Sequence, residues 1–493
     1  MISAQLPILQ VILPLIMAPV VLIIRNVYAV WIVTLTVSWI TFCISIALLF
    51  QVDEASKITY RIGGWAAPWG IEYVLDKLGS FVLIIVSAIG SIVITYAKRS
   101  VEAEIPEDRI YLFYAMFLLC LSGLLGIVIT GDVFNLFVFL EISSLSSYVM
   151  ISLGRNKRAL TAAYRYLIMG TIGATFYIIG VGLMYMMTGT LNMADLAALI
   201  PSISNSRTIH TALAFLTVGI GLKLAMFPLH LWLPNAYTYA PSVVTAFLAA
   251  TATKVAAYVL IRIVFTLFGE VNILENLSLQ YSMMALAIIA MFVASITAIF
   301  QENLKRMFAY SSVAQIGYII LGLSFASQIG LAASVIHLFN HAIIKCAIFM
   351  GLGCIALRAG VSIRDINGLG YRMPWTTAPI VIGGLGLIGI PMTAGFISKW
   401  YLVRAALELN MWPLAILIVL SSLIAIIYVW RFVEAAYLKP AHEKNINIRE
   451  APLSMLLSLW ILALASIYFG VDATTTLSMA LDAAENLLQG ESK

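Results

Sequence analysis

The sequence predicts an all-α polytopic membrane protein, and three observations lead to that fold class. Of the 493 residues, 62% are hydrophobic and only 10% are charged, which is more apolar surface than a soluble globular protein needs. Apolar runs of about 20 residues, the length that crosses a bilayer, follow one another along the chain. These runs are too long and continuous for barrel strands, so the spans are predicted to be helices.

By that length criterion the chain contains about fourteen spans. They lie near residues 5–24, 28–50, 73–97, 110–130, 132–153, 160–187, 209–233, 241–267, 278–300, 306–325, 330–357, 374–405, 411–437 and 452–471. No polar segment separates them, so residues 1–493 are predicted to form a single membrane domain. The tail after the last span is predicted to form a short amphipathic surface helix.

The loop cations predict the orientation. One set of alternate loops holds Arg25, Lys98, Arg99, Arg109, Arg155, Lys157, Arg158, Lys305, Arg306, Arg358, Arg364, Arg372, Lys439, Lys444 and Arg449. The opposite loops hold little more than Lys57, Arg61 and Arg207. Because cytoplasmic loops carry the excess of Lys and Arg, we expect a multi-pass cell-membrane protein with both termini outside the cytoplasm.

Composition also excludes several classes of function. A scattered net charge of +5 disfavours nucleic-acid binding. None of the four cysteines has CxxC spacing, so disulfides, iron–sulfur clusters and zinc are disfavoured. No Walker A pattern, haem motif or catalytic triad is present, so we expect no cofactor, no resident metal and no direct use of ATP.

Charged residues inside the spans are the candidates for function, because ionisable groups at membrane depth are costly and usually functional. Glu141 lies nine residues into its span, about 13 Å deep. The simpler alternative is a lone carboxylic acid kept protonated by desolvation. Its natural partner is a lysine of another span, either Lys223 or Lys254. Lys254 itself is predicted to belong to an ion pathway, with a snorkelling interfacial lysine as the alternative.

A stripe of polar residues follows in SVIHLFNHAIIKCAIF, where His337, His341 and Lys345 are spaced by four and share one helix face. A zinc site is a weak alternative, since no third ligand accompanies the histidines. A hydrogen-bonded packing role is the usual explanation for one such histidine. Three polar residues in one stripe favour a proton wire, because histidine gains and loses protons near neutral pH.

Two spans are predicted to be broken beside a lysine. Pro228 follows Lys223 in one, and Pro391 precedes Lys399 in the other. Interrupted helices in corresponding positions of two halves are typical of inverted repeats. We therefore predict five-helix repeats at 110–267 (spans four to eight) and 278–437 (spans nine to thirteen), with spans seven and twelve broken.

Four further charged or titratable residues have open interpretations. Glu434 is explained equally well by a local ion pair with Arg431 and by a role at the exit of a path. Asp76 and Lys77 are interpreted as interfacial charges. His230 lies near the predicted cytoplasmic end of its span, where packing, contact with water and proton uptake are all possible roles.

Together these residues predict a row of protonatable groups across the middle of the protein. The row consists of Glu141, Lys223, Lys254, His337, His341, Lys345 and Lys399. A moving Glu141–Lys223 pair would switch Lys223 between holding and releasing a proton, which would then pass along the row. Unpaired backbone groups at the broken helices would bind water and complete half-channels to each side. The residues indicate ion translocation but not its energy source.

Four segments of this sequence resemble a known family. They are GDVFNLFVFLE, GLKLAMFPLHLWLPNAYTYAPS, HLFNHAIIK and GIPMTAGFISKW. They look like the antiporter-like subunits shared by respiratory complex I and the Mrp multisubunit cation/proton antiporters, and the resemblance covers nearly the whole chain. It implies fourteen spans, two inverted five-helix repeats and broken helices seven and twelve.

The resemblance also implies roles for individual residues. Glu141 and Lys223 would form the coupling pair, Lys254 and His337 would be central relay positions, and Lys399 would be the terminal relay lysine. His341 and Lys345 rest more on their place in the helical stripe. The segment TYRIGGWAAPWGIEYVLDKLGS and the lysine at 399 are similar to the D-type member of Mrp antiporters, whereas the M-type member of complex I usually carries glutamate at that point.

Three functions follow as alternatives. The leading one is a D-type subunit that works with other membrane subunits to exchange H⁺ for Na⁺, with no enzyme activity of its own. The second is a proton-pumping subunit of a redox complex, either an NADH–quinone oxidoreductase or a membrane-bound hydrogenase. The third is a scaffold subunit without transport, which the buried charges disfavour because inert charges in lipid carry a cost.

Overall fold

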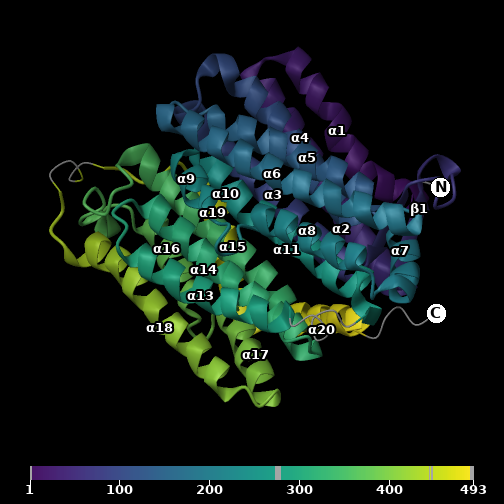
Figure 1. Ribbon diagram of the computed structural model, residues 1–493. Coiled ribbons are helices and arrows are strands. Elements are labelled where there is room, and N and C mark those ends of the chain that lie inside the picture. The colour runs from purple at the N-terminus through teal and green to yellow at the C-terminus, as the bar shows by residue number, and fades with distance from the viewer. Residues whose placement is uncertain (1–2, 272–278, 443–444, 446–447, 489–493) are drawn as a thin grey trace.

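The computed structural model describes residues 3–271, 279–442, 445 and 448–488, and it confirms a mostly helical membrane protein (Figure 1). In that described part, 12 helical segments are long and apolar enough to cross a bilayer. They are α1 (Leu6–Ile24), α2 (Val27–Ala55), α3 (Lys77–Glu104), α4 (Ile110–Ile129), α5 (Val133–Ser152), α6 (Lys157–Thr188), α10 (Ser242–Ala250) with α11 (Ala252–Ile261) and the π-helix η5 (Arg262–Leu267), α13 (Leu279–Ile299), α14 (Leu304–Ser324), α15 (Gln328–Arg358), α18 (Trp412–Val433) with the π-helix η8 (Glu434–Leu438), and α19 (Leu453–Val471).

The two remaining predicted spans are the two that were expected to break. Span 209–233 consists of α8 (Arg207–Leu224) and α9 (Trp232–Tyr239), and span 374–405 consists of α16 (Pro374–Ile388) and α17 (Ala394–Glu408). The short helices α7 (Met193–Leu199) and α20 (Thr474–Leu488) complete the set, and α20 lies where the tail helix was predicted. Residue 278, at the start of the ninth predicted span, and the loop cation Lys444 lie outside the described residues.

One predicted span boundary was wrong, and one predicted span is interrupted. The third span does not begin at residue 73, because Glu72–Asp76 forms strand β2, which pairs antiparallel with β1 (Lys57–Arg61). The eighth span is not continuous, because Thr251 leaves helical geometry between α10 and α11. The Thr251 hydroxyl donates back to the Phe247 carbonyl at 2.7 Å, a contact that bends helices.

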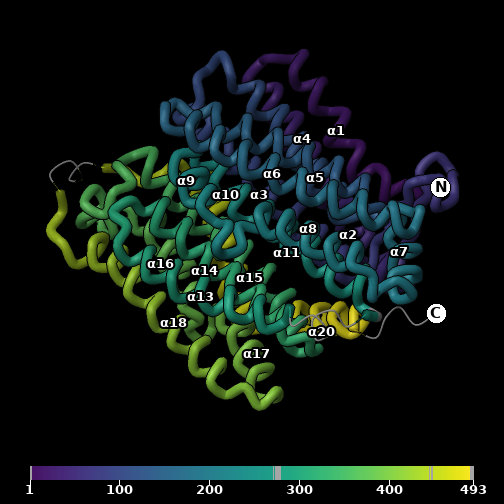
Figure 2. The backbone as a smooth tube through the Cα atoms, in the orientation of Figure 1, coloured from purple at the N-terminus to yellow at the C-terminus, as the bar shows by residue number. Residues whose placement is uncertain are grey.

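The helices differ sharply in how much of their surface is covered. In α11, α14 and α15 nearly every side chain is buried, whereas in α1, α2 and α18 most side chains are exposed or only partly buried. Figure 2 shows the backbone of α15 passing through the middle of the bundle, between the N-terminal and C-terminal groups of helices. The most covered helices are therefore those that carry Lys254 and the stripe that begins at His337.

The hairpin, the start of α1 and helix α20 lie at one end of the bundle (Figure 1). The Tyr60 hydroxyl of β1 donates to Gln5 at 2.6 Å, and Lys77 forms an ion pair with Asp482 of α20 at 2.8 Å. The first and last described helices thus meet at the same end, as an even number of spans requires. Which end faces the cytoplasm stays a prediction from the loop cations.

Asp76 is not an ordinary interfacial charge. Its carboxylate accepts from the Gly79 amide at 2.8 Å, which caps α3, and it accepts from both terminal nitrogens of Arg262. Burial would raise the pKa of Asp76, but the Arg262 guanidinium outweighs it and holds that pKa below its ordinary value. A carboxyl with a lowered pKa stabilises the fold above its unfolded pKa, near 4, and loses that contribution as the pH falls through its folded value.

We expect Asp76→Ala to destabilise the protein strongly. The change removes the cap of α3, worth about 1 kcal/mol, and leaves the Arg262 charge buried without its partner, a loss of about 3–5 kcal/mol. Thermal unfolding of the purified complex at neutral pH measures the effect, with the exposed Asp53→Ala as the matched control. A melting temperature equal to that of the control would show that the pair does not stabilise the fold.

The two halves of the chain share three features at corresponding positions. Both fourth helices break, and both fifth helices, α10–α11 and α18, end in a π-helix. In the first half Asp132 bridges to Asn192 at the end of the bundle where β2 lies, and Asn303 bridges to Ser362 in the second half. Each bridge joins the start of the second helix to the segment after the third, as the predicted inverted repeat would require.

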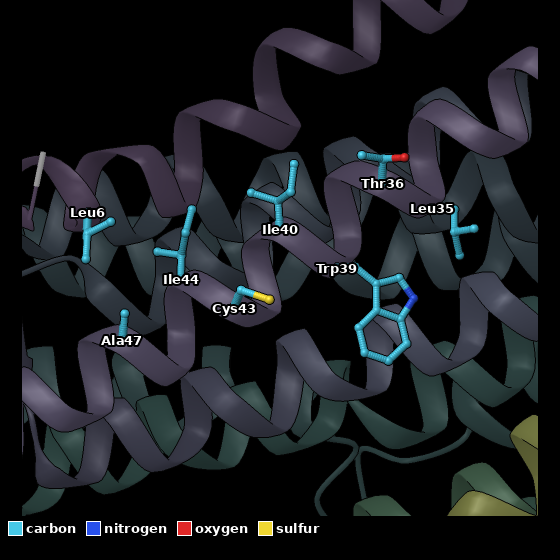
Figure 3. A pocket seen from close by; sticks show the side chains of 8 residues that line it. All are labelled: Leu6, Leu35, Thr36, Trp39, Ile40, Cys43, Ile44 and Ala47. Atoms are coloured by element: carbon cyan, nitrogen blue, oxygen red, sulfur yellow. The ribbon is translucent and has the colours of Figure 1, made fainter.

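An apolar groove of about 560 Å³ lies between α1 and α2 (Figure 3). It is lined by Leu6, Leu35, Thr36, Trp39, Ile40, Cys43, Ile44 and Ala47. None of these side chains is charged, and none belongs to the predicted row. The groove therefore fits the apolar exterior that a bilayer requires and does not hold the site.

Candidate functional site

The site is built around the break between α8 and α9. Ala225 adopts a left-handed conformation (φ 60°) and its amide bonds back to Leu222, so α8 ends at Leu224, one residue after Lys223. The indole nitrogen of Trp232 donates to the Leu222 carbonyl at 2.9 Å, which satisfies an oxygen that the break leaves without a helical partner. Trp232 in turn stacks on Tyr166 of α6, with ring centroids 3.9 Å apart. The break is thus held in a defined geometry.

Lys223 contacts the carboxylate that the sequence suggested as its partner. Its Nζ lies 3.1 Å from Oε1 of Glu141 on α5 and donates to the Ser144 hydroxyl at 2.7 Å. The Lys223 side chain is 5% exposed and that of Glu141 is 24% exposed. Glu141 is therefore paired rather than a lone protonated acid, and it is the more accessible member of the pair.

A small cavity extends from Lys223 toward α11. Its volume is about 20 Å³, and it is lined by the polar residues Ser143, Ser144, Ser147, Tyr166 and Lys223 and by the apolar residues Leu124, Ile127, Leu140, Ala252, Val255 and Ala256. A cavity of this size with partly polar walls is large enough for about one water molecule. The cavity ends against the helix that carries Lys254, so it covers part of the step between the two lysines.

Lys254 is buried in the interior of the bundle. It is 1% exposed, so the interfacial interpretation is wrong. Its Nζ donates to the Ala249 carbonyl, which the interruption at Thr251 leaves open, and it lies 3.4 Å from the Thr253 hydroxyl. Lys254 is therefore held in place by a hydrogen bond to the interruption in its own span.

The stripe on α15 lies in the most covered part of the protein. His337, His341 and Lys345 are each at most 2% exposed. The Lys345 ammonium donates to the Phe308 carbonyl at 2.7 Å and to the Ser311 hydroxyl. Nδ1 of His337 lies 2.8 Å from the Ser398 hydroxyl. The two imidazole rings are 6.0 Å apart, so the stripe is continuous along the helix.

His341 is the unusual member of this stripe. Among the described residues, neither of its ring nitrogens has a hydrogen-bond partner, although the ring is buried. It lies within Coulombic reach of Lys254, Lys345 and His337. No group of three metal-binding side chains occurs in the described part of the chain, so a zinc site gains no support there.

Lys399 lies beside the second break and donates hydrogen bonds to the carbonyls at the end of α16. Its Nζ donates to the carbonyls of Leu387 and Ile388 at 2.7 and 3.1 Å, and to the Ser422 hydroxyl at 3.0 Å. Those carbonyls end α16, where helices leave their last oxygens unpaired. The ammonium also lies 4.5 Å from the ring centroid of Tyr318, whose hydroxyl is 3.2 Å from Ser422.

One chemical feature distinguishes Lys223 from the other lysines of the row. Lys223 has a carboxylate partner, whereas Lys254, Lys345 and Lys399 are held by carbonyl and hydroxyl oxygens. An amine with or without its extra proton can donate an N–H to such neutral oxygens. This environment therefore holds a lysine in place in both protonation states, which suits a group that passes a proton on.

The serine hydroxyls that support the row were not predicted from the sequence. Ser144, Ser311, Ser398 and Ser422 each contact a row residue from another helix. The run SSLSS after Glu141 was the only available signal, because isolated serines are common in apolar helices.

The structure gives contacts for His230 and Glu434, whose interpretation was left open by the sequence. His230 is mostly buried and stacks on Phe227 at 5.2 Å, which favours packing. Glu434 does form a local ion pair, one of the two interpretations left open, but its partner is Lys439 at 3.4 Å and not Arg431. Arg431 instead donates to the carbonyls of Ile299 and Gln301.

A multi-span helical bundle with broken helices beside buried lysines is the architecture of an ion-translocating membrane protein. Comparison with known proteins gives the family. Residues 130–425 match the family described as NADH:quinone oxidoreductase/Mrp antiporter, transmembrane. The chain belongs to this family, as an antiporter-like membrane subunit that is not an enzyme on its own.

Two curated relatives represent two branches of the family. The N-type subunit of an NADH-quinone oxidoreductase from Desulforudis audaxviator is 41% identical over 87% of both chains. The D-type subunit of a Na⁺/H⁺ antiporter from Alkalihalophilus pseudofirmus is 29% identical over 90% of this chain and 89% of its own length.

Two solved structures are also similar. A chain of an archaeal membrane-bound sulfane sulfur reductase, a respiratory membrane complex, has a TM-score of 0.89 with 31% identity and covers 98% of both chains. A chain of the Mrp complex from Dietzia has a TM-score of 0.90 with 24% identity, covering 100% of this chain and 98% of its own. The latter likeness shows the fold, and it extends over the whole length.

Proposed function

We propose that this chain translocates protons along the buried row, as one subunit of a hetero-oligomeric membrane complex. The observation that carries the proposal is the Glu141–Lys223 ion pair at the end of a broken helix, inside the bundle. The names of the relatives, each a subunit or a part of a complex, support the need for other membrane subunits. The two halves act as the inverted repeats 110–267 and 278–437.

The mechanism follows from the contacts of the row. When Glu141 approaches Lys223, the ammonium is stabilised by the carboxylate, and when the pair opens, the buried ammonium loses that stabilisation. Lys223 then releases its proton through the cavity toward Lys254. From Lys254 the charge passes to His341 and His337, and His337 contacts the hydroxyl of Ser398, the residue that precedes Lys399 in α17. Lys345 is a side branch of the stripe toward α14.

For the energy source, the first candidate is exchange of H⁺ for Na⁺ in a D-type antiporter subunit. It is favoured by Lys399 and by the 59–80 segment, which resemble the D-type member of Mrp antiporters. The second candidate, a proton-pumping subunit of a redox complex, is favoured by the 41% identity to the N-type oxidoreductase subunit and by the likeness to the sulfane sulfur reductase chain.

The complex purified through this chain distinguishes the two candidates. In proteoliposomes, we expect a Na⁺ gradient to drive proton movement in the opposite direction without any electron donor. The Lys223→Ala complex is the negative control for both candidates. Proton movement that requires a reductant and an electron acceptor, and that ignores Na⁺, would reject the antiporter and favour the redox complex.

A further inference from the structure

A second ion pair between a buried lysine and a glutamate lies outside the row, where α3, α10 and α14 meet. Lys305 in the first turn of α14 was predicted to be a loop cation, but its side chain is only 6% exposed. Its Nζ lies 3.8 Å from Oε2 of Glu104, the last residue of α3. Two groups that are far apart in sequence are therefore paired at the end of the bundle that the loop cations assign to the cytoplasm.

This pair holds the joint between α9 and α10, which belong to the two spans that carry Lys223 and Lys254. Lys305 donates to the Ala240 carbonyl at 3.3 Å, where α9 ends, and Glu104 accepts from the Ser242 amide at 2.9 Å, where α10 begins. The other oxygen of Glu104 accepts from the Ser100 hydroxyl at 3.1 Å. The ion pair thus binds both sides of the joint: Lys305 binds the carbonyl at the end of α9, and Glu104 binds the amide at the start of α10.

The exposures of the two side chains differ in a direction that suits proton uptake. Glu104 is 27% exposed and Lys305 only 6%, so a proton from water reaches the carboxylate first. Three other charged or titratable groups surround Glu104 or lie beside it: Lys305 from α14, Tyr96 from α3 and Arg155 from the loop after α5. Two of the three, Lys305 and Arg155, are cations.

The side branch of the row ends close to the inner member of this pair. Phe308 and Ser311, which hold the Lys345 ammonium, follow Lys305 by three and six residues along α14. The distance along the helix from Lys305 to Ser311 is about 9 Å, so proton transfer across it would need one or two bridging waters. Lys345 would then be the point where the side branch meets the stripe on α15.

We propose that the Glu104–Lys305 pair is the proton-uptake port of the row on this face of the membrane. The Lys305 ammonium of the resting pair first releases a proton inward, toward Lys345, and becomes the neutral amine. The Glu104 carboxylate then takes a proton from water and passes it to that amine, which restores the carboxylate and the ammonium. This inference rests on the proposed proton translocation and adds the point at which protons reach it.

The test is the pH dependence of proton transport by the whole complex in membrane vesicles. Glu104→Gln keeps an oxygen for the Ser242 amide but cannot hold a carboxylate proton. We expect its initial rate to be within about two-fold of native at acidic pH, and on the order of ten-fold lower at alkaline pH, where proton capture becomes limiting. Glu102→Gln, two residues earlier on α3, is the matched control and should follow the native profile.

A second variant separates proton transfer from positioning. Lys305→Arg keeps a charged donor for the Ala240 carbonyl but cannot release a proton. We expect it to lose transport at alkaline pH while the complex assembles normally. Native transport by Lys305→Arg, or an equal loss in Glu104→Gln at every pH, would overturn the uptake role and leave the pair as a structural clamp.

The outcome is separable from that of the proposed function. If Lys223→Ala is inactive at all pH values and Glu104→Gln keeps the native profile, translocation along the row stands and the uptake port is wrong. If Lys223→Ala transports protons normally, the proposed function itself fails, whatever Glu104→Gln does.

Discussion

Replacing either member of the Glu141–Lys223 pair is expected to abolish proton transport while the complex still assembles. Lys223 has the only carboxylate contact among the row lysines in the described part of the chain, so the pair is the one place where moving a charge changes how tightly a proton is held. We expect Glu141→Ala and Lys223→Ala each to lower transport by about 10²-fold or more. Proton movement in vesicles measures the loss, and subunit content measures assembly.

Matched controls distinguish this role from a general effect of charge. Lys157→Ala and Glu54→Ala remove exposed charges of the same types and should leave transport unchanged. Glu141→Gln combined with Lys223→Met removes both charges together, so no unpaired charge is left buried. We expect this double variant to be more stable than Glu141→Gln alone, yet equally inactive. Recovery of transport in the double variant would show that the pair serves only stability.

The features that the sequence predicted correctly are those that the membrane imposes on each segment separately. The spans follow from apolar length alone, since lipid requires every backbone group to be satisfied within its own helix. The two breaks follow from local chemistry, because Pro228 and Pro391 cannot continue a helix hydrogen-bond ladder. The Glu141–Lys223 contact followed because few groups at membrane depth could neutralise each other.

The features that it missed depend on contacts between distant segments. Asp76 and Arg262 are separated by 186 positions, and nothing near either residue indicates the other. Lys305 looked like a loop cation because it stands at the end of an apolar run, and only the packing of α3 and α9 buries it. Thr251 lies at a helix interruption, but its residue type does not indicate the break. Thr34, Thr171 and Thr297 donate their hydroxyls to the carbonyl four residues earlier in the same way without interrupting their helices.

The same distinction between local features and contacts of distant segments explains which parts of the row were predicted. Spacing by four placed His337, His341 and Lys345 on one face of α15, which is a continuous helix whose two imidazole rings lie 6.0 Å apart. Spacing could not show that Ser398 and Ser311 approach that face from α17 and α14. The polar oxygens that hold the row in place come from neighbouring helices, so they become visible only when the helices are packed.

A relay role and a packing role for Lys254 predict opposite effects of its substitution on proton transport. Its ammonium holds the Ala249 carbonyl at the interruption of its own span, so a structural lysine would tolerate any donor of similar length there. A relay lysine must also give up its proton, which arginine cannot do. We therefore expect Lys254→Arg and Lys254→Met both to reduce proton transport by about 10²-fold or more, with normal assembly.

The neighbouring Thr253→Val provides the matched control for Lys254. It removes the hydroxyl 3.4 Å from Nζ but leaves the Ala249 contact, so transport should stay within about two-fold of native. Transport by Lys254→Arg at the native rate would contradict the relay, because the guanidinium would then be replacing only a hydrogen-bond donor. Loss in Lys254→Arg together with native transport in Lys254→Met would instead indicate that charge at this position blocks a water path. In that case protons would pass from the cavity beside Lys223 to His341 without Lys254.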